Sequence, residues 1–172
     1  TVTDPFSLSH TVVVQAVADT PSVDVGAENK TTVEENSGFV AYEVVISLND
    51  LDGSETYQSI VIDFSTPGSG ALPDIAFGNI TGFNRTYAPG QVTLTGTTSG
   101  LELALLALEV KPGTRNGEDI TVAVTVTAVE SNPSESGVVG SEISVPTAVA
   151  SDSFLIPVSP VSEAVPFIFA PD

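Results

Sequence analysis

The sequence contains no cysteine, no methionine and no tryptophan in 172 residues, and it has a single histidine. Without cysteine the chain cannot form disulfides, thiolate metal sites or a cysteine nucleophile, so any brace for the fold must be non-covalent. The histidine, His10, lies in an N-terminal strand-like run, and no catalytic triad can be built around it. Paired acids could hydrolyse glycosides, but no acid is set apart from the others in a way that would raise its pKa. We therefore expect a protein that is not an enzyme.

Basic residues are also scarce. Four Lys and Arg stand against 22 Asp and Glu, which gives a net charge of −18. Such a surface repels nucleic acid and anionic lipid, and it attracts cations. No run approaches the roughly 20 apolar residues of a membrane span, and the first residues lack the pattern of a signal peptide. We expect no nucleic-acid partner, no direct membrane insertion, and a soluble segment excised from a longer protein.

Strand-like patterns dominate what the sequence does contain. Hydrophobic residues make up 41% of the chain, which is enough for a core despite the charge. In the run DITVAVTVTAVE, residues 119 to 130, apolar side chains alternate with threonine and alanine, and AYEVVISL and SIVIDF alternate in the same way. Turns that contain Gly or Pro separate these runs. The pattern predicts an all-β fold, an antiparallel β-sandwich.

The stretch GLELALLALEV, residues 100 to 110, is the one candidate for a helix. Its apolar phase switches between Leu105 and Leu106. We interpret the switch as a bulge or a single helical turn between two short extended pieces.

Two similar segments mark candidate module boundaries. VADTP at residues 17–21 and VSEAVP at residues 161–166 share a valine, an acid and a following proline, and each comes after a strand-like run. We interpret residues 1–16 as the last strand of a preceding module or an extra N-terminal strand. Residues 17–160 would then be one β-sandwich module, and residues 161–172 a linker into the next module or an extended tail.

The stretch NDLDGSE, residues 49 to 55, gathers Asp50, Asp52 and Glu55 around one glycine. Their mutual repulsion is unfavourable unless a cation lies among them, and oxygen ligands in a flexible loop suit Ca²⁺. The glycine falls at the wrong position for an EF-hand loop, so other loops must complete the site. Because a sandwich brings strand ends together, we predict that the shell draws on further acids at such ends: Asp19, Glu35, Asp119 and Glu130. The alternative is a charged turn that only keeps a sheet edge soluble.

These segments together carry a family resemblance. The order VADTPSV, VEEN, LNDLDGSE, IVIDF, GLELALLALEVKPG, DITVAVTVTAVES and SFLIPVSPV resembles the repeat modules of large bacterial RTX adhesins exported by type I secretion. The resemblance implies a calcium-dependent Ig-like or cadherin-like Greek-key sandwich that adjoins further modules of the same adhesin. It also implies metal roles for Asp50, Asp52 and Glu55 at DLDGSE and for Asp19 at VADTP, and an extracellular location at the bacterial cell surface.

The connection over residues 65 to 91 is longer than the compact turn of the family's usual module. Loops of this length are usually functional, and this one concentrates contact-forming residues. We predict that it binds ligand through Phe83, Asn84, Arg85 and Tyr87. The resemblance implies a peptide, held by its C-terminal end, or a glycan on another cell surface. Alternatively, the aromatic residues cap the sandwich and FGNITGF is one more strand.

Two functions stay open at this point. The first is a ligand-binding adhesin module, and the second is a structural extender whose Ca²⁺ ions rigidify a tandem array without any ligand. In both, the acids repel one another in calcium-poor cytosol, whereas external Ca²⁺ neutralises them and drives folding. The two differ in whether the chain forms a pocket.

Overall fold

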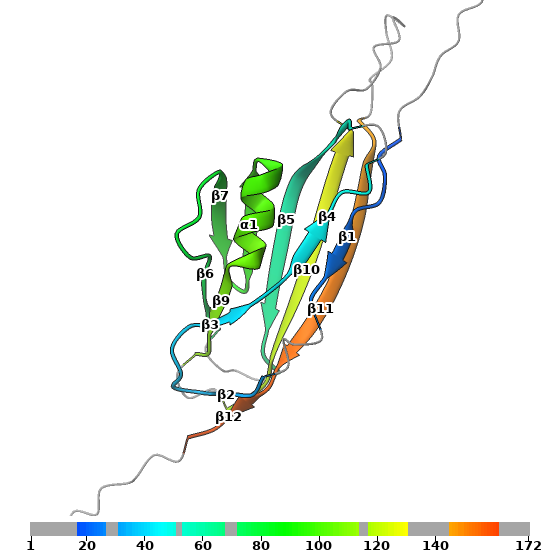
Figure 1. Cartoon of the computed structure of the whole chain (residues 1–172). Helices are drawn as coiled ribbons and strands as arrows, with labels where there is room; N and C mark the ends of the chain where they lie inside the picture. Colours follow the sequence, from blue (N-terminus) through cyan, green and yellow to red (C-terminus); the bar gives the residue numbers. More distant parts are fainter. Residues whose placement is uncertain are drawn as a thin grey trace, which may run out of the picture.

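The computed structural model describes six segments of the chain: residues 17–26, 31–50, 53–67, 72–113, 117–130 and 145–161. Residues 1–16 and 162–172, which we interpreted as pieces of neighbouring modules or as an extra strand and an extended tail of this one, lie outside the described residues, as does Asp52. The described part is one elongated β-sandwich (Figure 1). Its first residues lie near one end of the long axis, and its last strand, β12 (Val158–Ser159), lies at the opposite end (Figure 1).

One layer of the sandwich is a five-stranded antiparallel sheet with the strand order β11-β10-β5-β8-β7. Its strands are β5 (Glu55–Ser65), β7 (Phe83–Ala88), β8 (Gln91–Gly96), β10 (Ile120–Glu130) and β11 (Thr147–Ile156). Buried and half-buried residues alternate over all 11 positions of β10, which confirms the pattern read from DITVAVTVTAVE. β10 pairs with β11 on one side and with β5 on the other, so it is an interior strand of the sheet.

The second layer is broken into shorter pieces. β1 (Ser22–Asp24) pairs with β4 (Val45–Ser47), and β9 (Leu108–Lys111) pairs with both β3 (Val40–Tyr42) and β6 (Asp74–Ala76). These pairs are all antiparallel. The layer therefore covers the large sheet in sections.

The run AYEVVISL directs alternate residues inward, as its pattern predicted: Tyr42, Val44 and Ile46 are buried. It does not form one strand, however. The backbone leaves β9 after Tyr42 and joins β1 from Val45, so β3 and β4 belong to different short sheets. At the change of partner, the Val44 N–H donates to the carbonyl of Leu105 at 3.3 Å.

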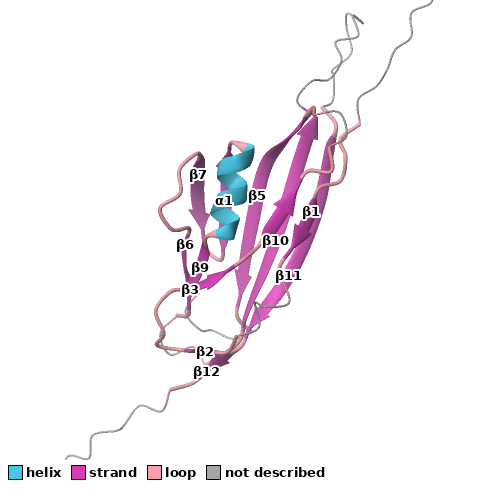
Figure 2. Ribbon diagram, viewed as in Figure 1, coloured by secondary structure: helices cyan, strands magenta, loops and turns pink. Residues whose placement is uncertain are grey.

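A helix, α1 (Thr98–Leu106), lies among the strands of the second layer (Figure 2). It begins at the N-cap Thr97, whose side chain accepts a hydrogen bond from the Gly100 N–H. Its core-facing residues follow the i, i+3, i+4 spacing of one helix face: Leu101, Ala104 and Leu105. The prediction of a bulge or single turn between two extended pieces is therefore wrong, since nine residues are helical and only β9 is extended. A leucine-rich run satisfies both spacings, and period alone does not separate them.

Residues 65 to 91 are not a single long loop. Strands β6 and β7 lie within them, and the chain turns tightly from β7 into β8 through Pro89 and Gly90. The segment FGNITGF is not one more strand either: residues 77 to 82 connect β6 to β7, and its last residue, Phe83, begins β7. Its first residue, Phe77, is fully buried. The region thus forms an edge of the sandwich.

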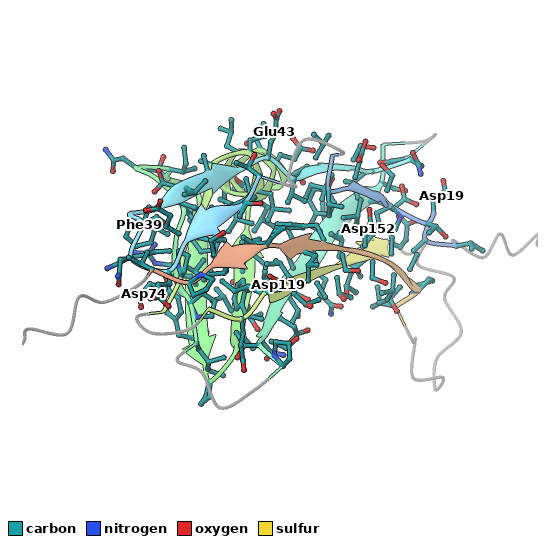
Figure 3. The ribbon with its side chains drawn as sticks, turned by 90° about the horizontal axis from the view of Figure 1, so that it is seen from below. Asp19, Phe39, Glu43, Asp74, Asp119 and Asp152 are labelled. Carbon is teal, nitrogen blue, oxygen red and sulfur yellow. The ribbon has the colours of Figure 1, made fainter. Side chains whose placement is uncertain are left out.

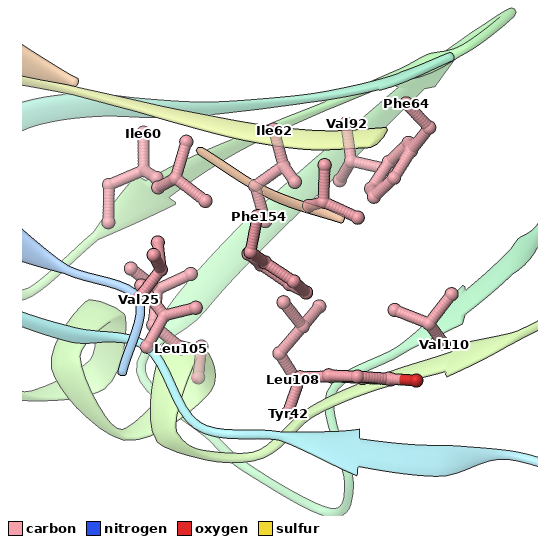
Figure 4. Close-up of a cluster of buried hydrophobic side chains, with 14 of the residues drawn as sticks. Val25, Tyr42, Ile60, Ile62, Phe64, Val92, Leu105, Leu108, Val110 and Phe154 are labelled. Atoms are coloured by element: carbon pink, nitrogen blue, oxygen red, sulfur yellow. The ribbon is translucent and has the colours of Figure 1, made fainter. Parts of the chain in front are cut away.

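The two layers enclose a core of aliphatic and aromatic side chains (Figure 4). Tyr42 and Phe154 pack across it from opposite layers, with 5.4 Å between their ring centroids. The predicted all-β fold, an antiparallel sandwich, is confirmed. Among the described elements its departures are α1 and the parallel pairing of β12 with β2 (Val33–Glu34). No helix in the described segments is long and apolar enough to cross a membrane.

Candidate functional site

Four of the predicted metal ligands gather at one end of the sandwich, where β5 begins and β10 ends. We call Asp19, Asp50, Glu55 and Glu130 the acidic end. Glu55 and Glu130 are direct partners in the β5–β10 ladder, and only 7% and 3% of their surfaces are exposed. The Asp19 N–H donates to Glu55 Oε1 at 3.0 Å, so the incoming chain is tied to this end.

Asp50 organises the turn of NDLDGSE. Its Oδ1 accepts a hydrogen bond from the Gly53 N–H, and its Oδ2 accepts one from the Glu55 N–H at 3.0 Å. Gly53 has a φ of 81°, a left-handed conformation that glycine adopts without a steric penalty. The first acid of the motif thus closes the turn that leads into β5. Asp52, predicted as a ligand from the same turn, lies outside the described residues.

The surroundings of Glu55 disfavour the ionised form of its carboxyl group. Its Oε2 is buried and receives no hydrogen bond. The Asp19 N–H, the largest single influence, lowers the pKa of Glu55 by stabilising the carboxylate. The Asp50 carboxyl, which can share a proton with Glu55, acts with burial and the charges of both aspartates to raise the pKa above its ordinary value of 4.5. The ionised form is therefore disfavoured unless positive charge is supplied.

The side chains of the acidic end are not arranged as a complete metal-coordination site. Among the described residues, no three or more His, Cys, Asp or Glu side chains are grouped so that they could hold a metal ion. Both oxygens of Asp50 and one of Glu55 instead accept backbone N–H groups. Since a carboxylate oxygen has two lone pairs, these hydrogen bonds leave acceptor capacity for a cation.

Glu35 and Asp119 lie at the other end of the sandwich. Asp119 precedes β10 and Glu130 ends it, so the 11-residue strand separates them by about 35 Å. The predicted single coordination shell is therefore wrong, because one strand cannot bring its two ends together. Here Asp119 Oδ1 accepts from the Val158 N–H and Glu35 Oε1 from the Val161 N–H, each at 3.0 Å. These acids hold the outgoing chain, as the acidic end holds the incoming chain.

The four predicted ligand-binding residues all lie on β7, but they face different surroundings. Phe83 packs edge-on against buried Phe77, with 5.7 Å between ring centroids, and so has a structural role. The Arg85 guanidinium lies 5.8 Å from the centroid of the Tyr87 ring, a cation–π arrangement. Asn84 is on the opposite face of the sheet from these residues, because successive side chains of a strand alternate.

A groove of about 330 Å³ opens beside Tyr87, between β6 and β7. Large apolar side chains in its lining are exposed: Phe39 by 48%, Leu72 by 43% and Tyr87 by 54%. Phe39 and Asp74, which both line the groove, lie at one side of the molecule, far from Asp19 (Figure 3). Sequence reasoning missed Phe39 and Leu72, because each stands in a connection without a periodic pattern.

No protein-family model matches the sequence, and no curated protein matches it. Among solved structures, the chain is similar to a cohesin module from a family 33 glycoside hydrolase of Clostridium perfringens. The two are 12% identical, with a TM-score of 0.36 over 85% of this chain and 100% of that module. We take nothing about function from a likeness at this level, and the β-sandwich rests on the strands described above.

Proposed function

We propose that this chain is a calcium-dependent module of a bacterial cell-surface adhesin, secreted by a type I system, that binds a peptide or glycan on another cell. The acidic end carries the proposal. Two buried glutamates are opposite each other there, and like charges in that position destabilise a sheet unless a proton or cation compensates. Glu55 Oε2, buried without a hydrogen bond, suits an oxygen ligand directed at a cation.

We assign the calcium ligands to Asp19, Asp50, Glu55 and Glu130, with Asp52 as a further carboxylate from the same turn. When bound, Ca²⁺ supplies two positive charges and takes six to eight oxygen ligands. The hydrogen bonds that Asp50 accepts hold its turn in place, and the Asp19 N–H orients the Glu55 carboxylate. The chain's own residues therefore gather carboxylates where the incoming segment joins the sandwich.

The overall shape favours a second candidate function, a structural extender. The incoming and outgoing segments lie at opposite ends of the long axis, an arrangement that suits a module in a tandem array (Figure 1). In that case the contact between Asp19 and Glu55 would stiffen a junction, and no ligand would bind. The apolar groove beside Tyr87 favours the ligand-binding module instead, because an extender needs no such opening.

Thermal unfolding in calcium and in chelator tests the calcium dependence. In excess Ca²⁺ the melting temperature should exceed that in EDTA by about 5–10 °C, because a ligand at 100 times its Kd adds about 2.7 kcal/mol. Mg²⁺ should stabilise less, since it demands octahedral geometry and keeps its waters. Equal melting temperatures in calcium and EDTA would overturn the proposal.

Arrays of peptides and glycans, probed in calcium and again in EDTA, test the ligand-binding part. Calcium-dependent binding to either array supports the adhesin module. A protein that is folded and responds to calcium, yet binds neither array, is an extender.

A further inference from the structure

β6 and β7 are the outermost strands of their sheets, one in each layer of the sandwich. Within the described residues, β6 pairs only with β9, and β7 only with β8. The groove lined by Phe39, Leu72 and Tyr87 opens between these two edges. Backbone hydrogen-bonding groups and apolar side chains are therefore accessible in the same place.

The backbone of β7 presents alternate residues to its open side. The Gly90 carbonyl accepts from the Phe64 N–H at 2.7 Å, so Gly90 bonds toward β5 and the next residue, Gln91, bonds toward β7. By alternation along this ladder, the residues of β7 that bond to β8 are Ala88, Thr86 and Asn84. The others direct their N–H and C=O groups to the open side: Phe83, Arg85 and Tyr87.

The side chains of these outward-bonding residues point into the sandwich. Arg85 and Tyr87 are opposite Leu94 and Val92, which are buried in the core, and opposite residues of a ladder share a face. Both side chains nevertheless remain exposed. For Tyr87, the backbone thus faces the open edge and the side chain lines the groove, and Arg85 lies two residues away on the same face.

Arg85 does not line the groove, but it lies beside Tyr87 on the same face of β7 and supplies a positive charge there. Among the described residues, no carboxylate forms an ion pair with its guanidinium, which stacks on Tyr87. Positive charge is scarce in a chain with 22 acids and four bases. Asp74 of the groove is opposite Lys111 in the β6–β9 ladder, where opposite charges attract across the two strands. Arg85, beside the groove, is therefore the group that would attract an incoming carboxylate.

We propose that β7 accepts an extended peptide as an added strand, with a carboxylate side chain opposite Arg85 and an apolar side chain two residues away in the groove. The spacing follows from that of Arg85 and Tyr87, which are two residues apart on one face. A peptide matches the open edge because it supplies backbone groups in strand register, which a glycan lacks. A second copy of this chain is repelled by its own charge of −18. This proposal deepens the ligand-binding role proposed above and rests on it.

Calorimetric titration in calcium with the nonapeptide acetyl-Ser-Thr-Leu-Thr-Glu-Thr-Leu-Thr-Ser-amide tests the proposal. The blocked ends remove any recognition of a free C-terminus, and the symmetric sequence suits either strand direction. We expect saturable binding. Exchange of the central Glu for Lys in the peptide should weaken binding by about tenfold or more, because the charge at Arg85 then repels it.

Variants on the two faces of β7 locate the peptide. Arg85→Gln should weaken binding about tenfold, and Leu72→Ser about fivefold through lost apolar contact. Asn84→Ser, on the opposite face of the same strand, is the matched control and should change affinity less than about twofold. Circular dichroism checks that each variant is folded.

Methylation of the peptide's backbone nitrogens makes the test specific to strand addition. In an added strand, alternate N–H groups point to β7 and the others point away. Methylating one alternate set should abolish binding, and methylating the other set should leave it nearly unchanged.

Folded protein that does not bind the nonapeptide overturns strand addition, and so does binding that Arg85→Gln and Leu72→Ser leave unchanged. Equal effects of the two methylation sets also overturn it. Dimerisation in sedimentation that Arg85→Gln abolishes would identify a second copy as the occupant instead. If EDTA alters neither melting nor peptide binding, the calcium-dependent function fails while strand addition stands.

Discussion

Glu55 and Glu130 are opposite each other across the β5–β10 ladder, and both side chains are buried. Each lies at a strand terminus beside the incoming segment, where Asp19 and Asp50 add two more carboxyls. Buried like charges lower the stability of a sheet unless a proton or a cation is present. The stability of this end should therefore depend on the solution in ways that simple experiments can measure.

Replacing Glu130 with Gln should have opposite effects with and without calcium. In EDTA the variant removes repulsion and should raise the melting temperature by about 2 °C. In calcium it removes a proposed ligand and should abolish most of the calcium-induced rise. Asp152→Asn, which removes one charge at an exposed position of β11, is the matched control. Loss of stability in both solutions would argue against a role for Glu130 in cation binding.

The pH dependence of stability in EDTA should report on Glu55. Its pKa is raised in the folded state, so the folded protein takes up this proton at a higher pH than the unfolded chain does. Stability is therefore gained as the pH falls from neutral toward 4.5, and lost as it rises through the folded-state pKa. Melting temperatures between pH 7 and pH 5 should rise less for Glu55→Gln than for the native sequence. Identical slopes would show that Glu55 is not the group involved.

In calcium, the stabilisation by the bound cation should decrease as the pH falls, in contrast to the gain in stability expected in EDTA. Ligand carboxylates must be ionised to bind a cation, so protons compete with it. We expect the calcium-induced rise in melting temperature to shrink as the pH falls. A rise that does not vary with pH would exclude carboxylate ligands.

Two buried tyrosines allow a matched test of hydroxyl contacts. The Tyr42 hydroxyl is buried without a hydrogen bond, and burial raises the pKa of Tyr42 to about 12. The Tyr57 hydroxyl donates to Glu102 at 3.4 Å. Tyr42→Phe should leave the free energy of unfolding unchanged or raise it by up to about 1 kcal/mol, whereas Tyr57→Phe should lower it by about 1 kcal/mol. Urea denaturation measures both, and a larger loss for Tyr42→Phe would contradict the assignment.

Asp119 should control the local stability of the outgoing strand. Asp119→Ala removes the acceptor of the Val158 N–H and should speed hydrogen exchange at that amide about tenfold. Amides in the middle of β10 should be unaffected. Asp119→Asn retains an acceptor oxygen and should restore most of the protection. Faster exchange throughout β10 would mean that Asp119 stabilises the whole sheet instead.

The local sequence predicted the acidic turn of the candidate site correctly, but it did not support a single coordination shell. The NDLDGSE turn closes on its own first acid, as a short Asp–Gly segment before a strand would suggest. By contrast, the prediction that Asp119 and Glu130 share a shell ignored the alternating run between them, which already implied a long strand. The groove was not readable, because Phe39, Leu72 and Tyr87 come from separate segments that only the packed sandwich brings together.

Of the two buried glutamates, the direction of one side chain follows from the sequence by itself, and the direction of the other was decided only by the tertiary structure. Glu130 continues the even-numbered phase of β10, and since strand side chains alternate, the sequence alone directs it inward. The same rule applied to β5 from Ile60 and Ile62 directs Glu55 outward.

The Glu55 side chain nevertheless points inward, because of how β5 pairs with β10. A register shift sets one extra β5 residue, Gln58, between the partners of Thr127 and Ala128, so the phase changes and Glu55 turns inward to meet Glu130. Such a bulge exists only between two paired strands, and these are far apart in the chain. No local pattern records it.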